Sequence, residues 1–205
     1  TALSQKKSPI TVSGGITIGD TAGTGGKMLP VEIPAGTVIQ GNSGASLSCR
    51  CPIQLTGDNV VIKDIKLTFE SSNALGSVPH REIFLAGHSL TLDNVDTYLA
   101  GAGGSLGGFG GTEEELLPSV YAGGFENTEI GNNASLTVQN ANSKTMFQGI
   151  YMGHGAGDDE KIPYTGAAVL KICPKTTVRD GIYTKENSGA EIEAAGEGNI
   201  SNVKF

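Results

Sequence analysis

Short runs of alternating apolar and polar residues recur along the chain, separated by turns rich in Gly, Asn and Asp. The clearest pair aligns residues 57–69, GDNVVIKDIKLTF, with residues 87–99, GHSLTLDNVDTYL, position for position. Each run starts with a turn, continues as apolar-x-apolar, passes an Asp or Asn, and ends in a second alternating stretch. A period of two predicts strands whose alternate side chains enter a core.

Further copies of this motif spread the repeat along the chain. Residues 133–141 repeat its first half, and residues 199–203 repeat a fragment. Looser copies occur at residues 36–42 and 177–182. The repetition indicates one kind of structural unit used many times, because self-similarity at short spacing is typical of stacked architectures.

Strands of only about three to five residues cannot bury an apolar face alone, but stacked copies can, with parallel strands about 4.8 Å apart. We therefore predict an all-β fold, a parallel β-helix of roughly seven to nine coils at ordinary solenoid repeat lengths. The alignment predicts that Ile62, Leu92 and Val138 are equivalent, buried and stacked in one aliphatic ladder. An antiparallel β-sandwich, which also uses short strands and Gly-rich turns, is the alternative.

The Asp or Asn inside each repeat is predicted to form a corner, since these residues tolerate left-handed backbone and hydrogen-bond their own turn. Residues 100–118 form a Gly-rich and acidic insertion that is predicted to project as a loop. This loop is either a tolerated insertion or a partner-binding element. Residues 1–205 are expected to form a single domain.

Composition narrows the class of partner. The 205 residues include 31 Gly and no Trp, and the charged fraction of 17% is below the usual value of about 25%. A formal charge of -7 predicts no binding to nucleic acid, because the chain would repel phosphate. No apolar run approaches the roughly 20 residues that cross a bilayer, so membrane insertion is not expected.

The three cysteines, Cys49, Cys51 and Cys173, cannot all pair within one chain. In a strand, Cys49 and Cys51 lie on the same face, which predicts two inward-facing core thiols, with a metal or redox pair as the alternative. Cysteine usage does not settle the cellular compartment, and whether the three thiols are free is left open.

The repeats at residues 57–69 and 87–99, with the segments 120–125 and 149–153, resemble right-handed parallel β-helix domains of the pectate-lyase-like type. Such domains occur in large extracellular proteins of Gram-positive bacteria, among them adhesins and the non-catalytic regions of surface zinc peptidases. The resemblance implies a right-handed solenoid at the cell surface or secreted, as part of a larger protein. The peptidase motif HExxH does not occur in this sequence.

Four tyrosines, Tyr98, Tyr121, Tyr151 and Tyr183, lie near the predicted ends of strands. If the coils stack in register, some of these rings line one face, and tyrosines on a rigid sheet suit a sugar or a protein partner. The simpler interpretation is that each ring packs at the edge of a coil.

Asp158, Asp159 and Glu160 are adjacent in a Gly-rich stretch, and carboxylates with nearby carbonyls are ligands for calcium. The alternative is an ordinary solvated acidic turn without any metal, and no other cofactor is expected. His80, His88 and His154 lack the spacing of a metal site.

No catalytic constellation is apparent. Asp64 and Asp93 fall on neighbouring coils in the alignment, and a structural role in the corner turns explains them more simply than catalysis. We therefore predict a non-catalytic secreted or cell-surface module for adhesion, or for binding a glycan or a host protein. The alternative is a β-helix polysaccharide lyase or glycoside hydrolase acting on an extracellular glycan.

Overall fold

The computed structural model of the chain describes residues 2–3, 5, 7–19, 29–69, 81–98, 117–125, 133–153, 166–184, 191–194, 199–200 and 203–204. For residues 191–204 it describes the backbone of the strands alone. The described part contains strands and no α-helix, so the all-β prediction is confirmed. Among the described residues, no helix long and apolar enough to cross a membrane is present.

The strands form two sheets. The first contains β1 (Ile10–Val12), β2 (Gly15–Ile18), β4 (Val38–Gly41), β5 (Ser46–Cys49), β7 (Val60–Phe69), β9 (Ser89–Asp96), β11 (Ala134–Gln139), β13 (Ala168–Ile172) and β15 (Glu191–Ala194). The second contains β3 (Val31–Ile33), β6 (Ile53–Leu55), β8 (Glu82–Phe84), β10 (Ser119–Tyr121), β12 (Met146–Tyr151), β14 (Thr177–Tyr183), β16 (Asn199–Ile200) and β17 (Val203–Lys204).

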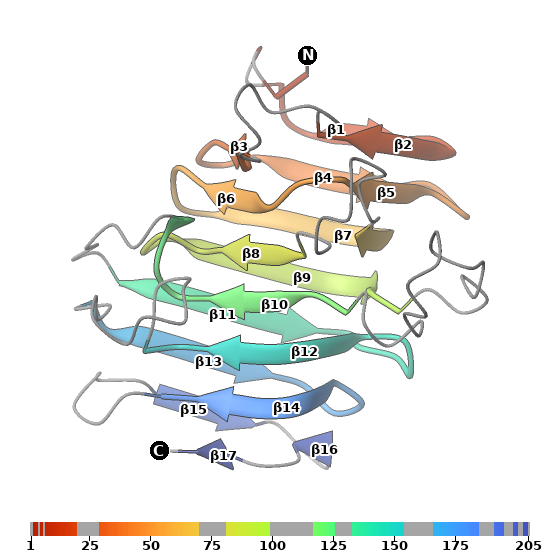
Figure 1. Cartoon of the computed structure of the whole chain (residues 1–205). Coiled ribbons are helices and arrows are strands. Elements are labelled where there is room, and N and C mark those ends of the chain that lie inside the picture. The colour runs from red at the N-terminus through yellow and green to blue at the C-terminus, as the bar shows by residue number, and fades with distance from the viewer. Residues whose placement is uncertain are drawn as a thin grey trace, which may run out of the picture.

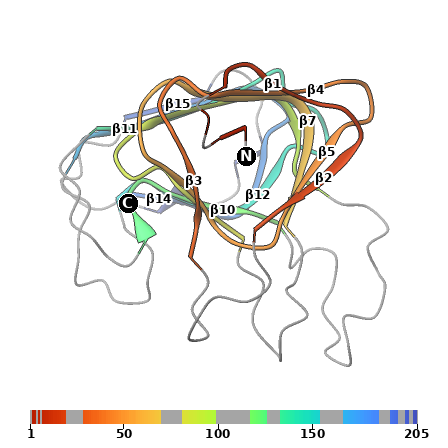
Figure 2. The same cartoon turned by 90° about the horizontal axis from the view of Figure 1, so that it is seen from above.

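From β6 onward the chain alternates between the sheets up to β16, and each strand lies beside the previous strand of its own sheet. Every pairing among the described strands is parallel. The antiparallel sandwich is thereby excluded for these strands. The N- and C-terminal ends lie at opposite ends of the stack, and the view along the stack shows the sheets surrounding a common interior (Figures 1 and 2).

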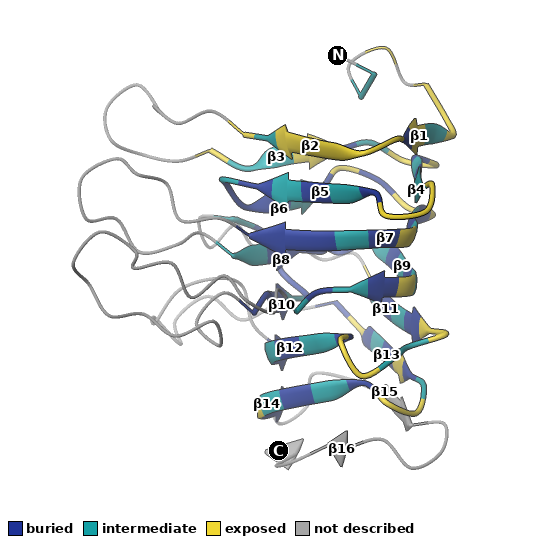
Figure 3. Ribbon diagram, turned by 90° about the vertical axis from the view of Figure 1, so that its right-hand side faces the viewer, coloured by how far each residue is buried: buried dark blue, intermediate teal, exposed yellow. Residues whose placement is uncertain are grey.

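The interior consists of aliphatic ladders that run across the coils. Ile62 pairs with Leu92 and Leu92 with Val138, and the three side chains are 1%, 0% and 2% exposed. The predicted ladder is confirmed. Figure 3 shows buried positions recurring through the inner strands from β5 to β14. The second sheet supplies a matching ladder, which comprises Val31, Ile53, Ile83, Val120, Ile150 and Ile182.

The Asp and Asn corners have the predicted left-handed backbone. Asp64, Asn94 and Asn140 have φ of 54°, 52° and 51°. Lys63 pairs with Asp93, and the amide of Asn94 donates to Asp64 Oδ1 at 2.9 Å, so equivalent corners lie in register on neighbouring strands. A single left-handed residue bends the strand sharply while both of its halves stay in the first sheet.

Two of the weaker repeat assignments are wrong. Residues 177–182 and 199–203 lie in the second sheet, where β14 pairs with β16 and β17, so they are not copies of the first-sheet strands. The copy that continues the first sheet is β13, whose Leu170 pairs with Leu136. The predicted loop at residues 100–118 lies outside the described residues except for Leu117 and Pro118.

Candidate functional site

A polar groove of about 400 Å³ lies along the corners of the first sheet. We call it the corner groove. Its lining comprises Gly41, Asn42, Ser43, Gly44, Ala45, Asp64, Ile65, Lys66, Asn94, Asp96 and Asn142. Sequence analysis singled out Asp64 as a corner residue and missed the groove itself.

The groove exists because neighbouring corners differ in width. The floor is formed where β7 and β9 turn with one residue each, Asp64 and Asn94. On one side, residues 42–45 form a wider turn that is closed by a hydrogen bond from the amide of Ala45 to the carbonyl of Asn42. On the other side, residues 142–145 form the same turn, closed from Thr145 to Asn142. The two tight corners are therefore recessed between two broader walls.

Both walls share an Asn-Ser start, Asn42-Ser43 and Asn142-Ser143, and this likeness is the sequence signal that would have located them. Gly41 brings the first wall close to the floor. A Cβ at Gly41 would collide with the carbonyl oxygen of Asp64, so no side chain fits there. The close approach fixes the position of the wall against the corner.

Carboxylate and amide groups hold the floor in place. Asp64 Oδ1 accepts from Asn94 Nδ2 at 2.9 Å, and Asp96 Oδ1 accepts from Asn142 Nδ2 at 2.6 Å. Asn142 Oδ1 in turn accepts from the backbone amide of Lys144 at 2.7 Å. The first two bonds join consecutive levels of the stack and the third fixes the Asn142 side chain within its turn, so the lining is preorganised before any ligand arrives.

Lys66 lies between the acidic residues of the groove. It is half-buried, and it pairs in register with Asp96 on β9 and with Ser46 on β5. Within the described part of the chain, its ammonium forms no ion pair. The groove therefore combines two carboxylates, one ammonium group and three amide side chains, a set that donates and accepts hydrogen bonds in several directions.

Three of the four predicted tyrosines come together, on the second sheet and away from the corner groove. Tyr121 pairs with Tyr151 and Tyr151 with Tyr183, in register on β10, β12 and β14. Their ring centroids are 4.7 Å apart in both pairs, with interplanar angles of 8° and 6°. Phe84 extends this tyrosine row at 5.6 Å from Tyr121. Tyr98 follows β9 of the first sheet and lies outside the row.

The geometry of the tyrosine row limits what it can bind. Nearly parallel rings with centroids 4.7 Å apart lie in the range of offset stacking, so neighbouring rings partly cover each other's faces. Each face of Tyr151 is therefore partly covered by a neighbouring ring. This partial cover makes the centre of the row a poor platform for stacking against a sugar.

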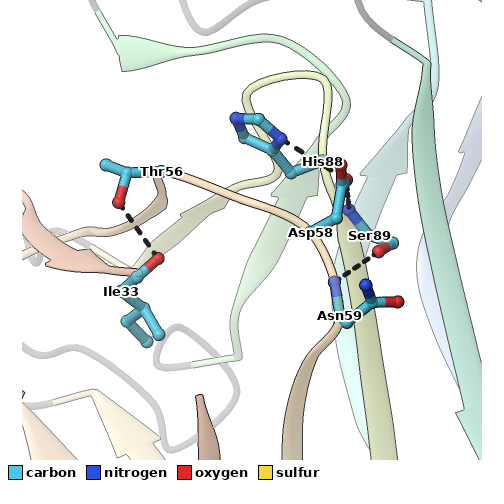
Figure 4. A network of polar contacts seen from close by, with 6 residues as sticks. All are labelled: Ile33, Thr56, Asp58, Asn59, His88 and Ser89. Carbon is cyan, nitrogen blue, oxygen red and sulfur yellow. Dashed lines mark hydrogen bonds and ion pairs between the residues drawn. The ribbon is translucent and has the colours of Figure 1, made fainter. Parts of the chain in front are cut away.

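His88 takes part in a network that links two turns (Figure 4). Its Nδ1 lies 3.4 Å from Asp58 Oδ1, which also accepts from the backbone amide of Ser89 at 3.1 Å. The hydroxyl of Ser89 accepts from the backbone amide of Asn59 at 2.7 Å. Among the described residues no hydrogen bond joins His88 to a hydroxyl, so this network ties neighbouring turns and does not form a nucleophilic triad.

None of the three cysteines forms a disulfide. Cys49 and Cys51 are buried, as predicted for inward-facing core residues, and Cys173 is half-buried. Burial raises the pKa of the Cys51 thiol, although a hydrogen bond with the backbone of Val31 opposes the shift. A thiol that stays protonated is a poor metal ligand, so Cys51 is suited to packing.

Asp158, Asp159 and Glu160 lie outside the described residues, as do His80 and His154. In the described part of the chain, no three His, Cys, Asp or Glu side chains are grouped so that they could hold a metal ion.

Comparison with known proteins supplies no relative. No family model, no curated protein and no solved structure matches the chain. The functional argument therefore depends on the site alone.

Proposed function

We propose that the chain is a right-handed parallel β-helix that serves outside the cell as a non-catalytic module and binds a neutral glycan in the corner groove. The alternation of parallel strands between two sheets supports the solenoid, with one coil for each strand of the path β1-β4-β7-β9-β11-β13-β15. The right hand of the coils follows the general rule for parallel crossovers.

The observation that carries the binding proposal is the preorganised polar lining of the corner groove. Sugar hydroxyls donate to carboxylates such as Asp64 and Asp96 and accept from Lys66. Because the two carboxylates are tied to the amides of neighbouring coils, they lose little rotamer freedom when a ligand is bound. The tyrosine row, whose central ring is partly covered on both faces, is not part of this site.

Charge favours a neutral sugar over an acidic one. The lining holds the carboxylates Asp64 and Asp96 against the single ammonium of Lys66, and the whole chain has a formal charge of -7. A uronic acid polymer would be repelled. This disfavours a lyase, which acts on acidic sugars.

The proposal is tested by isothermal titration with neutral oligosaccharides, such as xylo-, manno- and cello-oligosaccharides, and with oligogalacturonate as the acidic comparison. Binding of a neutral oligosaccharide should weaken at least about tenfold in Lys66→Met, a loss of about 1.4 kcal/mol. Lys63→Met is the matched control, because Lys63 lies on β7 outside the lining. No binding by any oligosaccharide, or equal binding by both variants, would overturn the proposal.

A glycoside hydrolase is the second candidate, because Asp64 and Asp96 line one groove and such enzymes use two carboxylates. The same samples are assayed for new reducing ends. Release of saccharide that is lost in Asp64→Asn and in Asp96→Asn would establish this enzyme in place of the binding module. Binding without release supports the non-catalytic module.

A further inference from the structure

The tyrosine row is built by a local motif in three strands. A small residue stands two positions before each ring, in Ser119-Val120-Tyr121, Gly149-Ile150-Tyr151 and Gly181-Ile182-Tyr183. Residues two apart share a face of a strand, so each ring has room to lean back over its small neighbour. The contact is clearest at Gly149, where an added Cβ would lie only 2.8 Å from the ring of Tyr151.

Each ring is held in its stacked position. The middle residue of each motif is a core residue that is 0% exposed, and it anchors the strand in register. Tyr183 is also fixed at its tip, because its hydroxyl donates to the carbonyl of Asp180 at 2.9 Å. The half-buried rings remain partly in contact with solvent. The phenol rings are thus held in a stack, with nearly parallel planes.

We propose that the tyrosine row is a site of oxidative cross-linking, at which a one-electron oxidant such as a peroxidase with hydrogen peroxide joins adjacent coils through dityrosine. The motivation is proximity. Nearly parallel rings in register, with centroids 4.7 Å apart, hold the two phenols next to each other, which gives their radicals a very high effective concentration.

The reaction balances as follows. Each of two phenols loses one electron to the oxidant and one proton to solvent, which leaves two phenoxyl radicals. The radicals form a carbon–carbon bond between their ortho carbons, and each ring regains aromaticity when its ortho hydrogen moves to the oxygen. The product has lost two hydrogen atoms and two oxidising equivalents have been reduced. Hydrogen peroxide accepts both and becomes water.

Such a bond would link neighbouring strands that the described structure joins side to side only by non-covalent contacts. None of the three cysteines forms a disulfide that could perform this task. A link from Tyr151 to Tyr121 or Tyr183 closes a loop between strands that are neighbours in space and distant along the chain. The cross-link is expected to raise the midpoint of thermal unfolding, because it restricts the unfolded chain.

The experiment exposes the purified chain to light with a ruthenium tris(bipyridyl) complex and persulfate, which together act as a one-electron oxidant. Monomer is isolated by denaturing electrophoresis, digested with trypsin and analysed by mass spectrometry. Cleavage after Lys144, Lys161, Arg179 and Lys185 places Tyr151 on peptide 145–161 and Tyr183 on peptide 180–185. We expect these two peptides to be joined with the loss of two hydrogens, together with the violet fluorescence of dityrosine.

Tyr151→Phe keeps the middle ring but removes its phenol hydroxyl, so the ring can no longer form a phenoxyl radical. It should lower the dityrosine in monomer at least tenfold, whereas Tyr98→Phe, outside the row, should leave it unchanged. If Tyr151→Phe fails to fold, Tyr183→Phe is used, which must abolish the link between peptides 145–161 and 180–185. Dityrosine found only in dimers, or an undiminished monomer yield in the folded variant, would overturn the proposal. The result is independent of glycan binding, since the row and the corner groove share no residue.

Discussion

The corner groove and the tyrosine row are both formed by side chains from neighbouring levels of the stack. They differ in whether the neighbouring side chains are of different types or identical. At the corner, a carboxylate lies beside an amide, as in Asp64 with Asn94 and Asp96 with Asn142. In the row, the same residue recurs on three consecutive strands. Parallel stacking in register places equivalent positions next to each other, so identical charges would repel, while identical aromatic rings attract.

This difference explains what each region can do. Charged positions in a stack must alternate or be neutralised, which leaves a mixed set of donors and acceptors that suits a polar ligand. Asp93 shows the same rule, since it accepts from Gln139 Nε2 at 2.9 Å and from Asn140 Nδ2 at 2.6 Å. Aromatic positions can repeat without penalty, but their faces are then partly covered by one another. A repetitive aromatic row is thus a poor sugar platform and a good site for ring coupling.

The largest expected effect comes from the core ladder on which both regions depend. Ile62→Asp would place an unpaired carboxylate between Ile39 and Leu92 at a position that is 1% exposed. The cost is several kcal/mol against a net stability of about 5 to 15 kcal/mol, so the chain should not fold. Circular dichroism and thermal unfolding provide the measurement.

Ile62→Val is the control for this substitution. It keeps the shape of the ladder and should cost only about 0.5 to 1.5 kcal/mol. A soluble Ile62→Asp protein that unfolds cooperatively near the wild-type midpoint would contradict the ladder.

The next largest effect is expected from a substitution that disturbs the tyrosine row and leaves the corner groove unchanged. Gly149→Ala should displace the ring of Tyr151, because the new Cβ would lie 2.8 Å from ring atoms. Two stacked pairs are then disturbed, each worth about 0.5 to 1.5 kcal/mol, so we expect a loss of about 1 to 3 kcal/mol in urea unfolding. The near-ultraviolet dichroism of tyrosine should change as well.

Gly15→Ala serves as the matched control in a strand of the first sheet. Its Cβ would meet only Ser46 Oγ, at 3.3 Å, and a small shift of that hydroxyl relieves the contact. If Gly149→Ala is no more destabilising than Gly15→Ala and leaves the tyrosine dichroism intact, the ring does not lie over Gly149.

A smaller effect tests the alternation of charge at the corner. Asn94→Asp would replace the amide that donates to Asp64 with a second carboxylate, at an exposed position. We expect a loss of about 1 kcal/mol or less near neutral pH, weakened by salt and by acidification, because ions screen the repulsion and protonation removes it. Urea unfolding at several salt concentrations measures the effect.

The double variant Asp64→Asn with Asn94→Asp restores one carboxylate beside one amide in reversed order. It should recover the stability lost in Asn94→Asp, and Asp64→Asn alone should be nearly neutral, since two amides can still pair. Failure of the double variant to recover stability would show that charge alternation does not govern the corner.

Much of the fold could be predicted from local pattern. The repeat at residues 57–69 and 87–99 carries its alternation in the sequence itself, so it predicted strands, parallel register and the left-handed corners at Asp64 and Asn94. The grouping of Tyr121, Tyr151 and Tyr183 was foreseen as one outcome of stacking. The stacking of nearly parallel rings was not, because it depends on the small residues at 119, 149 and 181 and on the exact register.

The corner groove could not be predicted from the same pattern. It depends on the difference in width between neighbouring corners, which is a property of four adjacent levels and not of any one repeat. Asn42 and Asn142 are far apart in the chain and resemble ordinary turn residues. The copies at 177–182 and 199–203 were misassigned because apolar-x-apolar runs occur in both sheets, and periodicity alone does not say to which sheet a strand belongs.

The smallest expected effect is a titration in the tyrosine row. Burial raises the pKa of Tyr151 above its ordinary value of about 10, and the neighbouring Tyr183 and Asp180 raise it further, while Arg81 opposes the shift. In the unfolded chain the phenol loses its proton at the ordinary pKa, whereas in the folded chain it keeps it to a higher pH. The unfolded state therefore binds fewer protons in this window, and the free energy of unfolding falls as the pH rises.

Tyr151→Phe removes the ionisable group and keeps the ring. We expect the loss of stability between about pH 9 and pH 11 to be less steep in this variant than in the wild type, as measured by urea midpoints at constant ionic strength. The corner groove contains no phenol. The double variant Asp64→Asn with Asn94→Asp should therefore lose stability with pH as steeply as the wild type, and it serves as the control. Equal slopes in Tyr151→Phe and in the wild type would mean that burial in the row does not raise the pKa of the Tyr151 phenol.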